Sequence, residues 1–143
     1  MNRYINRRTM LAFLATFGLL AGCATQGRDL IASGTVKLEK VSSALGTIDP
    51  VTIIQEGEKV KLRGEVKRRP DGRGFIPGHI DLEVIDPEGH VLERCVIDYY
   101  PGPKSTYANF HAILKATPPP GSTIRVIHNP RVVSAPQHSR CNG

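Results

Sequence analysis

The stretch KVKLRGEVK, residues 59–67, decides the fold. Val60, Leu62, Gly64 and Val66 share one phase of it, and every residue of the other phase is charged. A period of two over this length predicts a β-strand with one face packed on a core and the other in water. The glycine on the inner row predicts a bulge or a close crossing of the facing sheet.

Further β runs flank this strand on both sides. Residues 78–85 and 90–100 enclose DPEG at 86–89, where a proline second and a glycine fourth predict the turn of a hairpin. Ile80, Leu82 and Val84 occupy the expected inner phase of its first arm. The other predicted strands comprise residues 35–41, 51–54, 106–114 and 123–128. Short strands separated by turns, with no helical period, predict an all-β fold.

The expected architecture is an antiparallel sandwich of about seven strands that follows an N-terminal signal peptide. Three features come in order: the charged strand, the DPEG hairpin and a proline-glycine step at 118–121 before the last strand. This order resembles the immunoglobulin and fibronectin type III class, as architecture only, over residues 35–128. A small closed barrel is the alternative.

The N-terminus is typical of a bacterial secretory signal. A head with three arginines and no acid precedes an apolar run at 10–21, which is shorter than the roughly 20 residues of a spanning helix. The run closes on Leu20-Ala21-Gly22-Cys23, which resembles the lipobox of bacterial lipoproteins. The resemblance implies cleavage before Cys23 and palmitate-type acylation of it. The alternative is a plain secretory signal that leaves Cys23 as an ordinary thiol.

By the same resemblance, the lack of an aspartate directly after Cys23 implies export to the outer membrane. We expect a lipid-anchored, periplasm-facing protein. Its predicted parts are a signal peptide (1–22), a lipidated tether (23–33), a β-sandwich (34–128) and a C-terminal tail (129–143).

The net charge of the mature chain is too small to indicate a nucleic-acid partner, and we expect none. Loss of the signal lowers Lys and Arg from 19 to 16 against 13 Asp and Glu, so the net charge falls from +6 to +3. The densest positive patch lies in residues 68–77, where Arg68, Arg69 and Arg73 form a candidate partner-binding loop. A merely solvated loop is the alternative.

Cys95 and Cys141 remain once Cys23 is lipidated. Two thiols in an oxidising compartment usually pair, so the sequence predicts a disulfide that docks the tail on a strand. The alternative is a buried Cys95 and a free thiol in a frayed tail.

The sequence predicts no catalytic, cofactor or metal site. Asp81, Glu83 and Asp98 lie in the phase expected to face solvent. His138-Ser139-Arg140-Cys141 is the only segment with ligand-like spacing. His79 and His90 could face each other across the DPEG hairpin.

We therefore expect a non-catalytic, lipid-anchored envelope protein that acts as a binding or structural module. Its partners would be the membrane, through Cys23, and an envelope protein or polymer. Tyr99-Tyr100-Pro101 with Tyr107 could supply an aromatic platform, although core packing at a strand end explains the same residues at least as well. The alternative function is a periplasmic metal-binding or metal-tolerance lipoprotein that uses histidines and Cys141.

Overall fold

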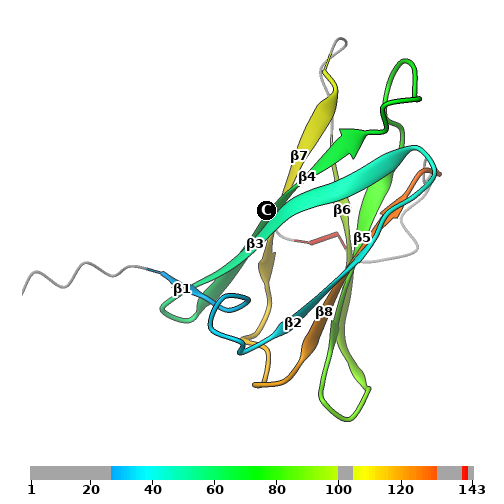
Figure 1. Cartoon of the computed structure of the whole chain (residues 1–143). Coiled ribbons are helices and arrows are strands. Elements are labelled where there is room, and N and C mark those ends of the chain that lie inside the picture. Colours follow the sequence, from blue (N-terminus) through cyan, green and yellow to red (C-terminus); the bar gives the residue numbers. More distant parts are fainter. Residues whose placement is uncertain (1–26, 100–104, 132–139, 142–143) are drawn as a thin grey trace, which may run out of the picture.

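The computed structural model describes residues 27–99, 105–131, 140 and 141. These residues form eight strands and no helix, arranged as two four-stranded sheets packed face to face (Figure 1). Sheet A has the order β1 (Arg28–Asp29), β3 (Gly46–Glu56), β4 (Lys59–Arg68) and β7 (Tyr107–Leu114). Sheet B has the order β2 (Lys37–Val41), β8 (Thr123–Asn129), β5 (His79–Ile85) and β6 (Val91–Asp98). The part of the chain that is described contains no helix able to cross a membrane.

The predicted all-β sandwich is confirmed. Every strand pair is antiparallel except β2–β8, which is parallel, and the two sheets stay separate rather than closing into a barrel. Many sandwich domains share this architecture with different strand orders, so the likeness to the immunoglobulin class remains one of architecture.

The charged strand β4 lies in the interior of sheet A and has the predicted facing. Val60, Leu62 and Val66 are fully buried, whereas the charged phase is exposed or half-buried. The prediction for Gly64 needs a correction. A Cβ at Gly64 would overlap the ring of Phe110, which is its register partner on β7 of the same sheet, not a residue of the facing sheet.

The bulge of this sheet lies in β3 instead. The β3–β4 register shifts between Ile48 and Val51, at the cis Asp49–Pro50 bond. Proline normally ends a strand unless it sits at a bulge or an edge. For this reason the sequence pattern predicted only residues 51–54, although β3 starts at Gly46 and Ile48 is buried.

The sandwich begins earlier than the predicted boundary at residue 34. Leu30 is fully buried, its amide donates to the carbonyl of Ile53 (2.9 Å), and the Asp29 carboxylate accepts the amides of Ile31 and Ala32. Residues 28–33 therefore pack on the fold and are not part of a tether. Among the described residues the core extends from Leu30 to Cys141, a span that residues 24–143 contain.

Two ends of the sandwich can be distinguished (Figure 1). The hairpin end holds β1, the β3–β4 turn and the DPEG turn, where Gly89 has the positive φ that this turn requires. The loop end holds the β2–β3 connection at 42–45 and the β4–β5 loop at 69–78. This polarity places β1, the first described strand, and the predicted basic loop at opposite ends of the sandwich.

Candidate functional site

The predicted basic loop is held in shape by one of its own arginines. The Arg68 guanidinium donates to the carbonyl of Gly74 (2.8 Å), and the buried side chain of Ile76 fixes the loop to the core. The amide of Arg69 donates to the carbonyl of Leu45 at 3.5 Å, which links the loop to the β2–β3 connection. Arg68 therefore shapes the loop, and the exposed Arg69 and Arg73 remain for a partner.

Two apolar side chains lie beside these arginines, and sequence reasoning missed both. Phe75 is 61% exposed and Leu45 is 44% exposed. The sequence does not show which of the neighbours Phe75 and Ile76 is exposed. In the structure Ile76 fills the core and Phe75 lies outside it. We call Leu45, Arg69, Arg73 and Phe75 the loop-end patch.

The outer face of β4 extends from this patch toward the hairpin end. Lys61 forms an ion pair and a hydrogen bond with Glu56, and this interaction lowers the pKa of the Glu56 carboxyl below its usual value. Lys67 lies 3.7 Å from Glu65. Arg63 has no ion-pair partner among the described residues and is exposed. The face thus keeps uncompensated positive charge.

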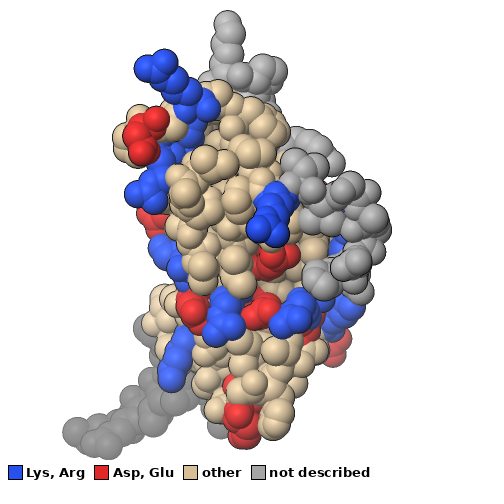
Figure 2. All heavy atoms as spheres, turned by 90° about the vertical axis from the view of Figure 1, so that its right-hand side faces the viewer, with Lys and Arg blue, Asp and Glu red and all other residues tan. Residues whose placement is uncertain are grey.

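The outer face of sheet B is balanced instead. Glu39, Arg125, Glu83 and Arg94 lie in register across its four strands and form a continuous ladder of ion pairs, with N–O distances of 2.8, 3.1 and 2.6 Å. Hydrogen bonds to Glu39 and Glu83 raise the pKa of Arg125. A row of alternating blue and red side chains crosses the face presented in Figure 2. Charges paired in this way leave little field for a partner.

A polar chain lies inside the loop end. Nδ1 of His128 is 2.7 Å from the Ser43 hydroxyl, and its Nε2 is 2.5 Å from the hydroxyl of Tyr99, which also lies 3.1 Å from the carbonyl of Pro77. Burial raises the pKa of Tyr99 to about 12. Burial, with the charge of nearby His79, lowers the pKa of His128.

Ser43 is a structural residue of this chain. Its hydroxyl also accepts the amides of Leu45 (3.0 Å) and Gly46 (3.2 Å), which closes the turn before β3. Sequence reasoning missed the pair because Ser43 and His128 are 85 residues apart. The signal for His128 was its phase, which continues that of Ile124 and Val126.

The structure joins Cys95 and Cys141 in a disulfide, the pair that the cysteine count predicts, with the Cα atoms 5.1 Å apart. Cys95 is fully buried on β6, and the amide of Cys141 donates to the carbonyl of Val96 (3.0 Å). Arg140 forms an isolated parallel bridge to Val96. Arg140 and Cys141 therefore cover the free edge of β6.

The suggested histidine pair does not form. His79 begins β5 at the loop end, where its imidazole lies 3.2 Å from Asp81, whereas His90 caps the DPEG turn through Asp86. His138 lies outside the described residues, and the sulfur of Cys141 is bound in the disulfide. Within the described ranges, no group of three or more His, Cys, Asp or Glu side chains could hold a metal ion.

Of the residues suggested for an aromatic platform, Tyr99 is buried and hydrogen-bonded as above, so the core-packing alternative holds for it. Tyr107 is exposed at the start of β7, and Tyr100 and Pro101 lie outside the described residues. The acids predicted for a wet face do lie in the outer phase of their strands, where Glu83 and Asp98 pair with arginines. The Glu83 side chain is only 12% exposed between two arginines, and Asp98 lies 3.3 Å from Arg140.

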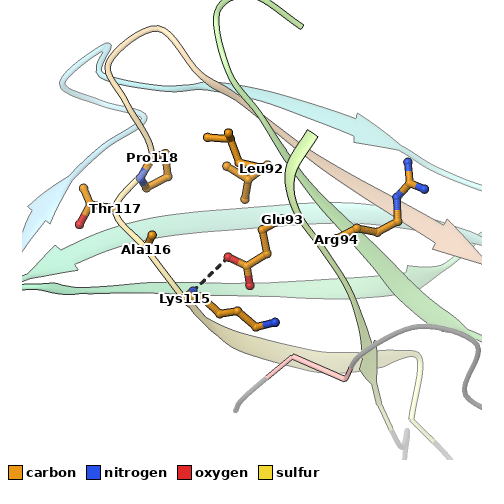
Figure 3. Close-up of a pocket in the computed structure, with 8 residues that line it drawn as sticks. Leu92, Glu93, Arg94, Lys115, Ala116, Thr117 and Pro118 are labelled. Atoms are coloured by element: carbon orange, nitrogen blue, oxygen red, sulfur yellow. Dashed lines mark hydrogen bonds between the residues drawn. The ribbon is translucent and has the colours of Figure 1, made fainter. Parts of the chain in front are cut away.

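A hollow of about 200 Å³ lies at the hairpin end between β6 and the segment after β7 (Figure 3). Leu92 and Pro118 form apolar walls, and the Glu93 carboxylate accepts the amide of Lys115 (3.0 Å). This volume is below the 300–1,000 Å³ of typical ligand pockets. Glu93 here ties the two sheets together and is not free to bind a ligand.

No protein family matches the chain, and no curated protein or solved structure is significantly similar to it. The lipobox and the rest of the predicted signal peptide lie outside the described residues.

Proposed function

We propose that this chain is a lipid-anchored, non-catalytic lipoprotein of the bacterial cell envelope whose β-sandwich serves as a binding or structural module. The observation that carries the proposal is the short separation in sequence between the lipobox and the first strand. β1 begins at Arg28, so only residues 24–27 separate it from Cys23. Cleavage before Cys23 would leave all eight described strands in place, and Leu30 is the first core residue of the described part of the chain.

The role as a binding module is supported by the contrast between polar groups that pair within the fold and side chains that are exposed on the loop. His128 and Glu83 have their partners inside the fold, whereas Arg69, Arg73 and Phe75 are exposed. Exposed loops of this kind suit contact with another surface. The metal-binding alternative loses support, because a disulfide occupies the sulfur of Cys141.

Substitution of Cys23 tests the anchor. In a Gram-negative host we expect the wild-type protein in the outer-membrane fraction, in the detergent phase, with the mass of residues 23–143 plus acyl chains. Cys23→Ser should appear as uncleaved precursor or as released protein. Cys141→Ser is the matched control, since it removes a cysteine and leaves the lipobox intact, and it should remain acylated. Normal processing and detergent partition of Cys23→Ser would refute the proposal.

A further inference from the structure

We propose that the outer face of sheet A and the loop-end patch together form the membrane-facing side of the domain, which docks on an anionic phospholipid surface. The inference deepens the proposed function and rests on it, because the anchor determines which surface lies within reach.

The first observation is the unequal charge of the two outer faces. Residues 56–73, which comprise the end of β3, β4 and part of the following loop, carry seven Lys or Arg against four Asp or Glu, a net charge of +3. The ladder across sheet B is neutral, with two arginines and two glutamates. Lys and Arg near an anionic leaflet are attracted to it individually. Sheet A is therefore the face that an anionic surface would select.

The second observation is the apolar part of the loop-end patch. Phe75 and Leu45 are exposed beside Arg69 and Arg73 at the same end of the sandwich. An aromatic and an aliphatic side chain next to cations suit the boundary between headgroups and acyl chains, where the apolar groups insert and the arginines meet phosphates. A sugar polymer would gain less from the exposed leucine, so this composition favours lipid.

The third observation is the position of the anchor. About nine residues of β3 separate its pairing with β1 from Gly46, or roughly 30 Å at 3.3 Å per residue. The link from Cys23 to Arg28 spans at most about 18 Å. An upright domain would hold the patch away from its own membrane. Because β1 is the edge strand of sheet A, a domain lying on that sheet brings the anchor, the basic face and the patch to the membrane together.

Vesicle binding by residues 24–143, which contain the whole core but no anchor, tests this inference. We expect co-sedimentation with vesicles of phosphatidylcholine and phosphatidylglycerol, weakened by salt, and little with phosphatidylcholine alone. Arg69→Gln/Arg73→Gln should weaken binding at least about tenfold. Phe75→Ser should weaken it with no change in charge. The control Lys37→Gln/Arg94→Gln removes the same charge from sheet B and should bind nearly as wild type.

Three outcomes would overturn the inference: no binding to either vesicle, equal loss in the control variant, or binding to purified peptidoglycan with none to vesicles. Circular dichroism of each variant checks that the sandwich is intact. Failure here would leave the proposed anchoring untouched, since the fragment lacks Cys23 and the anchor is tested by acylation in cells.

Discussion

His128 is a titratable side chain that the fold buries at the loop end. One arrangement of protons, assigned from the hydrogen-bond network, satisfies its whole chain. The Ser43 hydroxyl donates to Nδ1, the Nε2 proton is donated to the Tyr99 oxygen, and the Tyr99 hydroxyl donates to the carbonyl of Pro77. A doubly protonated ring would reverse the first bond and leave the Ser43 proton without its acceptor. The network therefore favours the neutral ring.

We predict that stability falls as the pH drops below about 6.5, the usual pKa of histidine. Because the pKa of His128 is lowered in the fold, the unfolded chain takes up the proton first. The stabilisation is complete above pH 6.5 and is lost progressively below it, by at most about 1.4 kcal/mol per pH unit. Urea unfolding at pH 7.5, 6.5 and 5.5 measures this change.

The matched variant is His128→Gln, which keeps a polar side chain but does not titrate. It should be less stable than wild type at pH 7.5 and should lose the part of the pH dependence that His128 causes. Identical pH profiles of the two proteins would show that His128 does not cause the pH dependence.

At the scale of single residues, the sequence predicted the roles that depend only on neighbouring positions in the chain. The inner phase of β4 was predicted because alternation is a property of a single strand. The contact of Gly64 with Phe110 was not, because it depends on the register between β4 and β7. No pattern within either strand encodes that register.

At the level of whole strands, the ion-pair ladder links all four strands of sheet B. Glu83 is central to it, since its carboxylate receives Arg94 from β6 (2.6 Å) and Arg125 from β8 (3.1 Å). Glu39, at the outer end on β2, forms an ion pair with Arg125 and is more exposed than Glu83. Position in the ladder should therefore determine how much each glutamate stabilises the fold.

We predict that Glu83→Gln destabilises the protein by about 1–2 kcal/mol, because hydrogen bonds to charged groups at a largely buried site are lost. Glu39→Gln, the same chemical change at the exposed end, should cost less than about 1 kcal/mol. Denaturant unfolding of both variants gives the comparison. Equal effects would show that the ladder is only a set of independent surface pairs.

Sequence alone could predict that these charges face away from the core, because their phase is opposite to Leu82 and Val126. It could not predict that they pair. The pairing needs β2 beside β8 in parallel and β8 beside β5, and both contacts join segments far apart in the chain. The all-β class was predictable, whereas the strand order was not.

At the scale of the whole molecule, the sequence again predicted the local features of the candidate site but not those that depend on the fold. Its arginines were predictable from local density, since Arg68, Arg69 and Arg73 fall in one loop. Leu45 belongs to another connection, and only the folded arrangement brings it to the same end. The opposite positions of β1 and the patch likewise follow from topology.

The disulfide links Cys141 to Cys95 on β6 of sheet B, and its contribution to stability can be measured. In the chain-entropy picture, a bond between residues 46 positions apart stabilises by about 3–4 kcal/mol. Cys95→Ala/Cys141→Ala should lose about this much and free the edge of β6, because the tail has few other described contacts holding it there. The sandwich should remain folded, since most of its core lies on the strands before Cys141.

Two measurements separate the bond from the packing of Cys95. Mass spectrometry of residues 24–143 after thiol alkylation should find no labelled cysteine without reductant and two with it. Cys141→Ala alone keeps the buried Cys95 side chain, so it should lose the tail contacts and leave no cavity at Cys95. Amide exchange should then rise along β6, whose edge Arg140 and Cys141 cover, and stay unchanged along β4. Two labelled cysteines without reductant, or an unchanged β6 in Cys141→Ala, would contradict this account of how the tail is docked.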